Sequence, residues 1–283
     1  MRLGLFVLAA QFPGRSQSHA LAGALDCAEA AERAGLDSVW IAEHHFISYG
    51  VCPSAVAFAA NVLGRTRRIQ VGTAVCILSN RHPAALAEET ALPDHLSGGR
   101  FTLGVGRGGP WVDLEVFGTG LDRYERGFAE SLDLLLGWLG SERAAASGDR
   151  FRFREVTVVP RPLTRPRPAV VVAATSRSTA ELAAARGLPL LLGMHQDDEA
   201  KVAMLAAYGP VAERHGHDPG RIGHLAAAVA HVADTNAQAT NRLRATMPGW
   251  LARGVGDYVA ITPGPRPRRL YRAPARHPPG GHP

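Results

Sequence analysis

Cysteine is scarce in this 283-residue chain, and Cys27, Cys52 and Cys76 lie far apart. An odd number of widely spaced cysteines argues against a disulfide framework or a zinc site, and predicts reduced thiols. Long apolar runs are also lacking, because no stretch reaches the roughly 18 residues of a membrane span. The apolar start at Met1–Ala10 is short and enters a turn at Phe12–Gly14. We therefore expect a cytoplasmic protein without a membrane segment.

Lysine is nearly absent, since Lys201 is the only one among 31 basic residues. Residues 263–283 contain five arginines and no acidic residue. The rest of the chain therefore contains 26 basic and 25 acidic residues. The body of the protein is therefore close to neutral, although the formal net charge is +6. A neutral body lacks the basic face that nucleic-acid binding requires, and we expect no nucleic-acid partner.

The chain is long enough for one large core, and 46% of its residues are hydrophobic. Apolar strand-like runs alternate with helical segments, which predicts a parallel sheet in an α/β fold of the TIM (β/α)8 barrel type. An inserted hairpin or extended excursion is expected at 150–168, before the fifth strand. The expected strands are 2–8, 37–41, 69–75, 101–105, 169–174, 188–192 and 224–232, and the expected helices are 18–34, 53–64, 83–96, 121–139, 177–186, 198–215 and 234–246.

The alternation stops after Trp250. One more apolar segment follows at 254–262, and residues 263–283 then contain seven prolines and five arginines. Such a composition offers almost no apolar surface to offset the entropy of ordering the chain. No eighth strand–helix unit is recognisable, so we expect an incomplete barrel domain over 1–262 and a disordered tail over 263–283. A GC-rich gene read out of frame is one origin of such a tail.

The segment Val39–Phe46 is a short apolar strand that ends in a carboxylate and two imidazoles. The active site of a (β/α)8 barrel lies at the carboxyl ends of its strands, which makes Glu43, His44 and His45 candidates for proton transfer. Paired histidines could instead bind a metal or form hydrogen bonds with loop carbonyls. The residues alone leave these three roles open.

Two further strands run into loops that carry Gly, Arg or His, at about the thirty-residue spacing of one strand–helix unit. Taken together, these segments resemble the bacterial luciferase-like flavin monooxygenases, and the luciferase alpha subunits in particular. The resemblance covers roughly residues 1–250. It is carried, in order, by 39–46, 71–83, 99–109, 113–119, 171–179 and 185–189.

The resemblance implies that reduced FMN binds at the carboxyl ends of the strands and reacts with O2 to a C4a-hydroperoxide that oxygenates a small organic substrate. A built-in nicotinamide site is not expected, so a separate flavin reductase is expected to supply the reduced FMN. A homodimer or heterodimer is implied, with its surface on the helices at 53–64 and 83–96, where Ala57 and Ala87 lie. The alternatives are a deazaflavin-dependent oxidoreductase, which shares this barrel, and a flavin-binding or dimer-partner subunit without chemistry of its own.

The resemblance also implies roles for residues around the flavin ring. His44 matches the family's catalytic imidazole, and Glu43 and His45 flank it. A near-neutral pKa suits an imidazole to moving a proton between substrate and oxygen. Ala74 and Val75 match the pair that carries a non-prolyl cis peptide bond beneath the flavin ring.

A second group of residues is implied in binding the FMN phosphate. Arg107 lies among glycines, where its guanidinium can donate two hydrogen bonds to phosphate oxygens. Ser176 and Thr179 open a helix, where backbone N–H groups favour an anion, although an ordinary N-cap is the alternative for Ser176. Thr175 and Met194 are also implied as contacts of the cofactor. They stand where light-emitting alpha subunits have glutamate and tryptophan, which argues against light emission and a long-chain aldehyde substrate.

Overall fold

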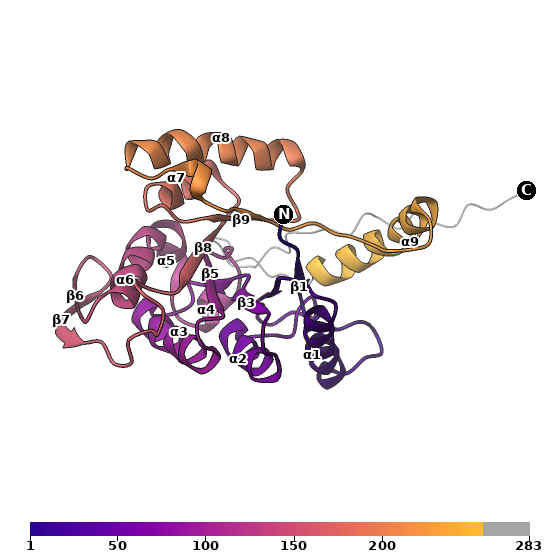
Figure 1. Cartoon of the computed structure of the whole chain (residues 1–283), viewed down its shortest axis with the longest axis horizontal. Helices are drawn as coiled ribbons and strands as arrows, with labels where there is room; N and C mark the ends of the chain where they lie inside the picture. Colours follow the sequence, from indigo (N-terminus) through magenta and orange to yellow (C-terminus); the bar gives the residue numbers. More distant parts are fainter. Residues whose placement is uncertain (257–283) are drawn as a thin grey trace, which may run out of the picture.

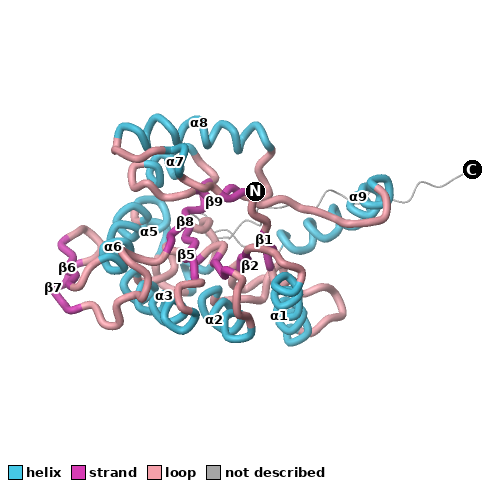
Figure 2. Tube along the Cα trace, viewed as in Figure 1, coloured by secondary structure: helices cyan, strands magenta, loops and turns pink. Residues whose placement is uncertain are grey.

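The computed structural model describes residues 1–256, which form one curved parallel sheet with helices packed on its outer side (Figures 1 and 2). The sheet follows the order of the chain, and a short strand, β4, pairs only with β5. Its strands are β1 (Gly4–Val7), β2 (Ser38–Ile41), β3 (Gln70–Thr73), β4 (Cys76–Ile77), β5 (Phe101–Gly106), β8 (Ala169–Ala174), β9 (Leu190–Leu192) and β10 (Leu225–Ala226).

This arrangement confirms the α/β barrel-type fold. Each strand pairs in parallel with the next, as in Leu5 opposite Val39 and Val39 opposite Val71. Among residues 1–256, β1 and β10 form the two edges of the sheet, so the barrel is open between them, in line with the expected incomplete barrel. The tail predicted at 263–283 and most of the segment 254–262 lie outside the described residues.

Helices connect the strands and start at the residues that the sequence indicates. Ser16 and Ser54 cap α1 and α2 by accepting hydrogen bonds from backbone N–H groups three residues ahead, and Pro83 is the first residue of α3. Gly98 ends α3 in the left-handed region, with a φ of 67°. These helices and the later ones are α1 (Gln17–Arg33), α2 (Ala55–Arg65), α3 (Pro83–Ser97), α7 (Arg177–Ala184), α8 (Asp198–Arg214) and α9 (Asn236–Gly256).

The single helix expected at 121–139 is two helices, α5 (Gly120–Arg126) and α6 (Phe128–Gly140), preceded by the short α4 (Asp113–Val116). The break falls at Gly127, where a Cβ would lie 2.6 Å from the carbonyl oxygen of Arg123. The chain turns there because only glycine permits so close an approach.

The insertion before the fifth barrel strand is an antiparallel hairpin of β6 (Arg143–Ser147) and β7 (Arg152–Thr157). It begins at Arg143, before the expected 150–168. The sequence did not indicate β6, because this Ala-rich strand has little strand propensity of its own and is defined by its pairing with β7. The seventh barrel strand is also shorter than expected, since only residues 225–226 of 224–232 pair with β9.

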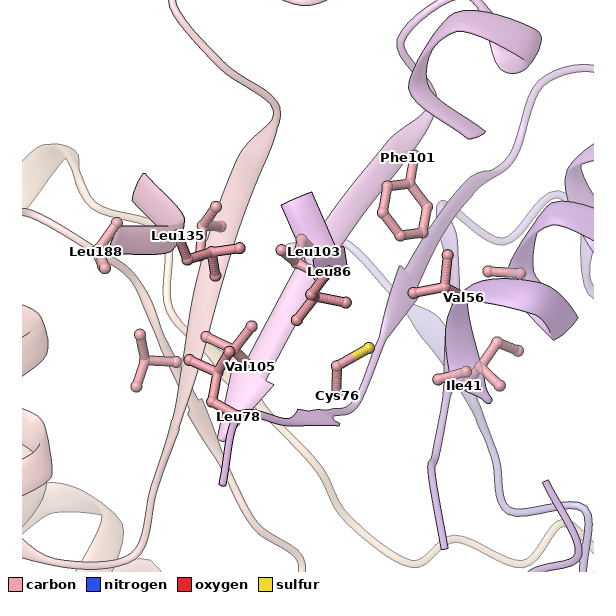
Figure 3. Close-up of a cluster of buried hydrophobic side chains, with 14 of the residues drawn as sticks. Ile41, Val56, Cys76, Leu78, Leu86, Phe101, Leu103, Val105, Leu135 and Leu188 are labelled. Carbon is pink, nitrogen blue, oxygen red and sulfur yellow. The ribbon is translucent and has the colours of Figure 1, made fainter. Parts of the chain in front are cut away.

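The core lies between the sheet and the surrounding helices (Figure 3). Leu103 and Val105 of β5 belong to the same buried cluster as Leu86 of α3 and Leu135 of α6. All three cysteines are free, as expected: Cys52 and Cys76 are buried and Cys27 is exposed. Over residues 1–256, no helix combines the length and apolar character needed to cross a membrane.

Candidate functional site

The loops that follow β2, β3 and β5 surround a cavity of about 250 Å³. Five of the predicted site residues lie there, namely Glu43, His44, His45, Ala74 and Val75. The peptide bond between Ala74 and Val75 is cis, as the resemblance implied. The complete lining is Glu43, His44, His45, Ile47, Ala74, Val75, Ile77, Gly108, Gly109, Trp111, Val112 and Asp113.

His44 is held against the wall of the cavity by its own loop. Its backbone N–H donates to the carbonyl of Cys52 at 3.0 Å, and its ring meets that of Tyr49 edge-on at 5.1 Å. Gly50 makes room for the ring, because a Cβ there would lie 2.5 Å from Nδ1 of His44. Burial, reinforced by the neighbouring His45, lowers the pKa of His44 from 6.5 to about 4. The imidazole is therefore neutral at pH 7, and the expectation of a near-neutral pKa is wrong because the ring is buried.

The lowered pKa of His44 predicts a pH-dependent stability. Above pH 6.5 the imidazole is neutral in both the folded and the unfolded chain. As the pH falls from 6.5 to about 4, the unfolded chain binds a proton that the folded chain does not, so the free energy of unfolding decreases. Urea unfolding of wild type and His44→Gln between pH 4 and 7 should show a steeper decline for wild type. Parallel curves would contradict the burial of a neutral His44.

Glu43 is fully buried, and both of its carboxylate oxygens have partners. Oε2 accepts hydrogen bonds from the N–H of Ala55 at 3.1 Å and from Nη2 of Arg81 at 2.9 Å. Oε1 accepts from the N–H of Ile77 at 3.3 Å and lies 3.6 Å from Nε2 of His45. Burial raises the pKa of Glu43, but His45, Arg81 and the backbone donors outweigh it and lower this pKa. These contacts make Glu43 a buried anion that positions His45 and joins α2 to β4. They do not favour a direct part in proton transfer.

His45 points its ring toward aromatic neighbours at the edge of the cavity. Its ring centroid lies 5.0 Å from that of Phe117 and 6.0 Å from that of Phe46, which has a positive φ of 61°. Over residues 1–256 no group of three or more His, Cys, Asp or Glu side chains is arranged to hold a metal ion. The contacts of His45 are thus with Glu43 and with aromatic rings.

The predicted phosphate-binding residues also come together. Nη2 of Arg107, which follows β5, donates to Oγ1 of Thr179 at 3.2 Å across 72 residues of sequence. Ser176 caps α7 by accepting from the N–H of Thr179, and its Oγ lies 3.0 Å from Oγ1 of Thr179. The guanidinium of Arg107 also lies 5.7 Å from the Phe128 ring centroid, and its buried Nε has no hydrogen-bond partner among the described residues. We call Arg107, Ser176 and Thr179 the anion corner.

Two of the predicted flavin contacts are peripheral in this structure. Thr175 is exposed at the end of β8, and Met194 is half-buried just after β9. Neither lines the cavity described above. Their roles stay predictions.

Sequence reasoning did not single out Trp111 and Asp113, which both line the cavity. Asp113 belongs to one of the segments that carried the resemblance, but nothing in its local sequence shows that its carboxyl group is buried at the site. Its hydrogen bond to Asn80 joins residues 33 positions apart, which only the folded chain reveals.

A model of the luciferase-like monooxygenase family matches residues 1–276. The chain belongs to this family. Two curated relatives of this luciferase-like monooxygenase are alkanal monooxygenase alpha chains. One, from a Kryptophanaron alfredi symbiont, is 32% identical over 250 residues, which are 88% of this chain and 70% of the relative. Another, from Photorhabdus luminescens, is 33% identical over 251 residues, covering 88% and 69%. Membership places the protein among the flavin-dependent monooxygenases.

Several solved structures share the fold of this luciferase-like monooxygenase. The monooxygenase RslO1 from Streptomyces bottropensis superposes with a TM-score of 0.78 at 26% identity, covering 91% of this chain and 83% of that one. The oxygenating constituent of 3,6-diketocamphane monooxygenase from Pseudomonas putida, in complex with FMN, has a TM-score of 0.77 at 21% identity, covering 89% and 73%. An F420-dependent secondary alcohol dehydrogenase has a TM-score of 0.74 at 20% identity, covering 89% and 76%. At such identities these last two likenesses show the fold alone, so the fold does not separate FMN from deazaflavin.

Proposed function

We propose that this protein is an FMN-dependent monooxygenase that receives reduced FMN from a separate flavin reductase and uses O2 to oxygenate a small organic substrate. The observation that carries the proposal is the joint presence, at the carboxyl ends of one sheet, of the anion corner and a cavity lined by the neutral His44 and the Ala74–Val75 pair. Reduced flavin, when bound, supplies the electrons that activate O2.

The anion corner has the donors that an FMN phosphate needs. Arg107 offers a guanidinium whose buried Nε is unpaired, and Ser176 and Thr179 offer hydroxyl groups at the start of α7. The first backbone N–H groups of a helix and its dipole stabilise an anion. These residues hold one end of the cofactor.

Two glycines of β5 and its loop lie in close contact with residues that line the cavity. A Cβ at Gly106 would lie 2.7 Å from Cγ2 of Val75, and one at Gly108 would lie 2.6 Å from Cγ2 of Ile77. Glycine at both positions lets the chain pack closely on these two side chains. The donors of the anion corner are the feature that fits the phosphate of a flavin nucleotide.

His44 and the aromatic side chains have separate tasks in this proposal. The neutral ring of His44 accepts a proton from the substrate and returns it to the leaving oxygen. Phe46 and Phe117 contact the ring of His45, which lines the cavity, and help to hold this ring in place. Glu43 keeps His45 in place through its 3.6 Å contact.

Anaerobic titration with reduced FMN and with reduced deazaflavin F420 tests the cofactor. We expect FMN to bind more tightly. Tighter binding of the deazaflavin would instead support the deazaflavin-dependent oxidoreductase, for which the F420-dependent neighbour is the argument. After admission of ¹⁸O2, mass spectrometry of a panel of alcohols, phenols and aldehydes should find one labelled oxygen in the product. FMN binding without label in any compound would support a non-catalytic flavin-binding subunit.

We also propose a dimer formed by the outer faces of α2 and α3. Ala57 is exposed on α2, but Ala87 is only 1% exposed and belongs to the core, so the expectation that Ala87 lies on the interface is wrong. Ala85 is the exposed alanine of α3. Ala57→Arg combined with Ala85→Arg should shift sedimentation toward the monomer, since bulky charges prevent close helix contact. The serine pair at the same positions is the control. An unchanged sedimentation coefficient would place any dimer contact elsewhere.

A further inference from the structure

Two aromatic rings lie beside the guanidinium of Arg107. Its central carbon atom lies 5.8 Å from the ring centroid of Tyr124 and 5.7 Å from that of Phe128. Tyr124 belongs to α5 and Phe128 is the first residue of α6, so the two residues flank the break at Gly127. At these distances the π face of an aromatic ring attracts a cation. The anion corner therefore has an aromatic side.

Arg107 has no acidic partner among residues 1–256, in contrast to arginines of neighbouring segments. Arg81 pairs with Glu43 at 2.9 Å, and Arg150 pairs with Asp122 at 2.7 Å. A carboxylate occupies the N–H groups of a guanidinium and compensates its charge. An aromatic ring attracts the cation and does neither. Arg107 therefore keeps its positive charge for an anion from solution.

The contact of Tyr124 with Arg107 is not a consequence of core packing. Phe128 is 3% exposed and belongs to the buried core cluster, so the core fixes the position of its ring. Tyr124 is half-buried and lies outside that cluster. An unrestrained arginine side chain has many rotamers, and ordering it when an anion binds costs free energy. A ring that orders the guanidinium beforehand reduces this cost.

We propose that Tyr124 positions Arg107 for the phosphate of FMN: its ring holds the guanidinium in place and leaves the charge uncompensated. The inference rests on the proposed function, in which the anion corner binds this phosphate. Tyr124 is then a positioning residue, because it acts through Arg107. Phe128 supplies a second ring, which the core holds fixed.

Fluorescence titrations of FMN and riboflavin with wild type, Tyr124→Leu and Tyr124→Phe test this proposal. Tyr124→Leu should weaken FMN binding about threefold to tenfold, the size of one contact between a cation and a ring, and leave riboflavin binding unchanged. Tyr124→Phe keeps the ring and should bind FMN like wild type. If Tyr124→Phe loses as much affinity as Tyr124→Leu, the hydroxyl group contacts the phosphate directly and the proposal is wrong. An equal loss for riboflavin would also overturn it.

A second comparison asks whether Tyr124 acts through Arg107. In an Arg107→Ala background, Tyr124→Leu should not weaken FMN binding further, because the guanidinium is already absent. A further loss of the same size would mean that Tyr124 acts without Arg107, and would overturn the proposal. Phe153→Leu is the control, at a half-buried ring that lies 6.1 Å from the ring of Trp138, and it should leave the ratio of FMN to riboflavin affinity unchanged.

Urea unfolding without any flavin separates this proposal from the proposed function. If FMN does not bind to wild type at all, the proposed function fails, and the contact itself can still be tested. The unfolding constant of the double variant Arg107→Ala/Tyr124→Leu should then rise by less than the product of the increases in the two single variants, because both remove the same contact. Independent effects would show that the ring does not hold the guanidinium, and would overturn the inference.

Discussion

Replacing His44 by alanine should slow substrate oxygenation at least about a hundredfold while leaving the affinity for FMN unchanged, because a positioned acid or base typically contributes that much. His44 lines the cavity, and burial lowers its pKa to about 4, so its ring is a neutral acceptor at pH 7. The anion corner is formed by other residues and stays intact in this variant. Product formation under saturating reduced FMN and O2, together with FMN titration, measures both effects.

His19→Ala is the matched control for His44→Ala. His19 is an exposed histidine on α1 that does not line the cavity. Its replacement should change the oxygenation rate little. If His44→Ala forms product at the wild-type rate, His44 is neither the acid nor the base, and His45 becomes the next candidate.

Replacing Arg107 by alanine should weaken FMN binding by about 1.5 to 3 kcal/mol, the range for losing a hydrogen bond to a charged group. That loss corresponds to roughly 10- to 150-fold in the dissociation constant. The guanidinium donates to Thr179 at the start of α7, and under our proposal it binds the FMN phosphate together with the helix N-terminus. Fluorescence titration of FMN with both proteins gives the two dissociation constants.

Riboflavin makes the test of Arg107 specific, since it carries the same ring without the phosphate. Wild type and Arg107→Ala should bind riboflavin equally if Arg107 acts on the phosphate alone. Arg126→Ala, at an exposed arginine bonded to Asp122, should leave FMN affinity unchanged. Equal FMN affinities of wild type and Arg107→Ala would remove Arg107 from the site.

Several features of the fold followed from local sequence patterns. Apolar runs at strand spacing and helices opened by a capping residue or by an early proline such as Pro83 predicted the order of the barrel elements, because periodicity and capping are properties of a few neighbouring residues. The hairpin was misplaced, since β6 has no strand pattern of its own and depends on β7. The break at Gly127 in the helix expected at 121–139 was not predicted. The close contact of Gly127 with the carbonyl oxygen of Arg123 is visible only in the folded chain.

By itself, the sequence determined the type of fold and the chemical groups at the ends of the strands. Alternating strands and helices require a parallel sheet, and a strand that ends in Glu43, His44 and His45 must present them at its carboxyl edge. The motifs in order determined the family. These conclusions need only residue type and spacing along the chain.

Only the tertiary structure decided what each of these groups can do. Contacts of Glu43 with α2, β4 and Arg81 make it a buried anion with no free oxygen, and burial makes the ring of His44 neutral at pH 7. Burial and hydrogen bonding determine the protonation state of a side chain and the hydrogen bonds that it can still form. Both depend on elements far away in the sequence. β5 and β8 pair directly in the sheet although they are far apart in the sequence, and this pairing places Arg107 within 3.2 Å of Thr179.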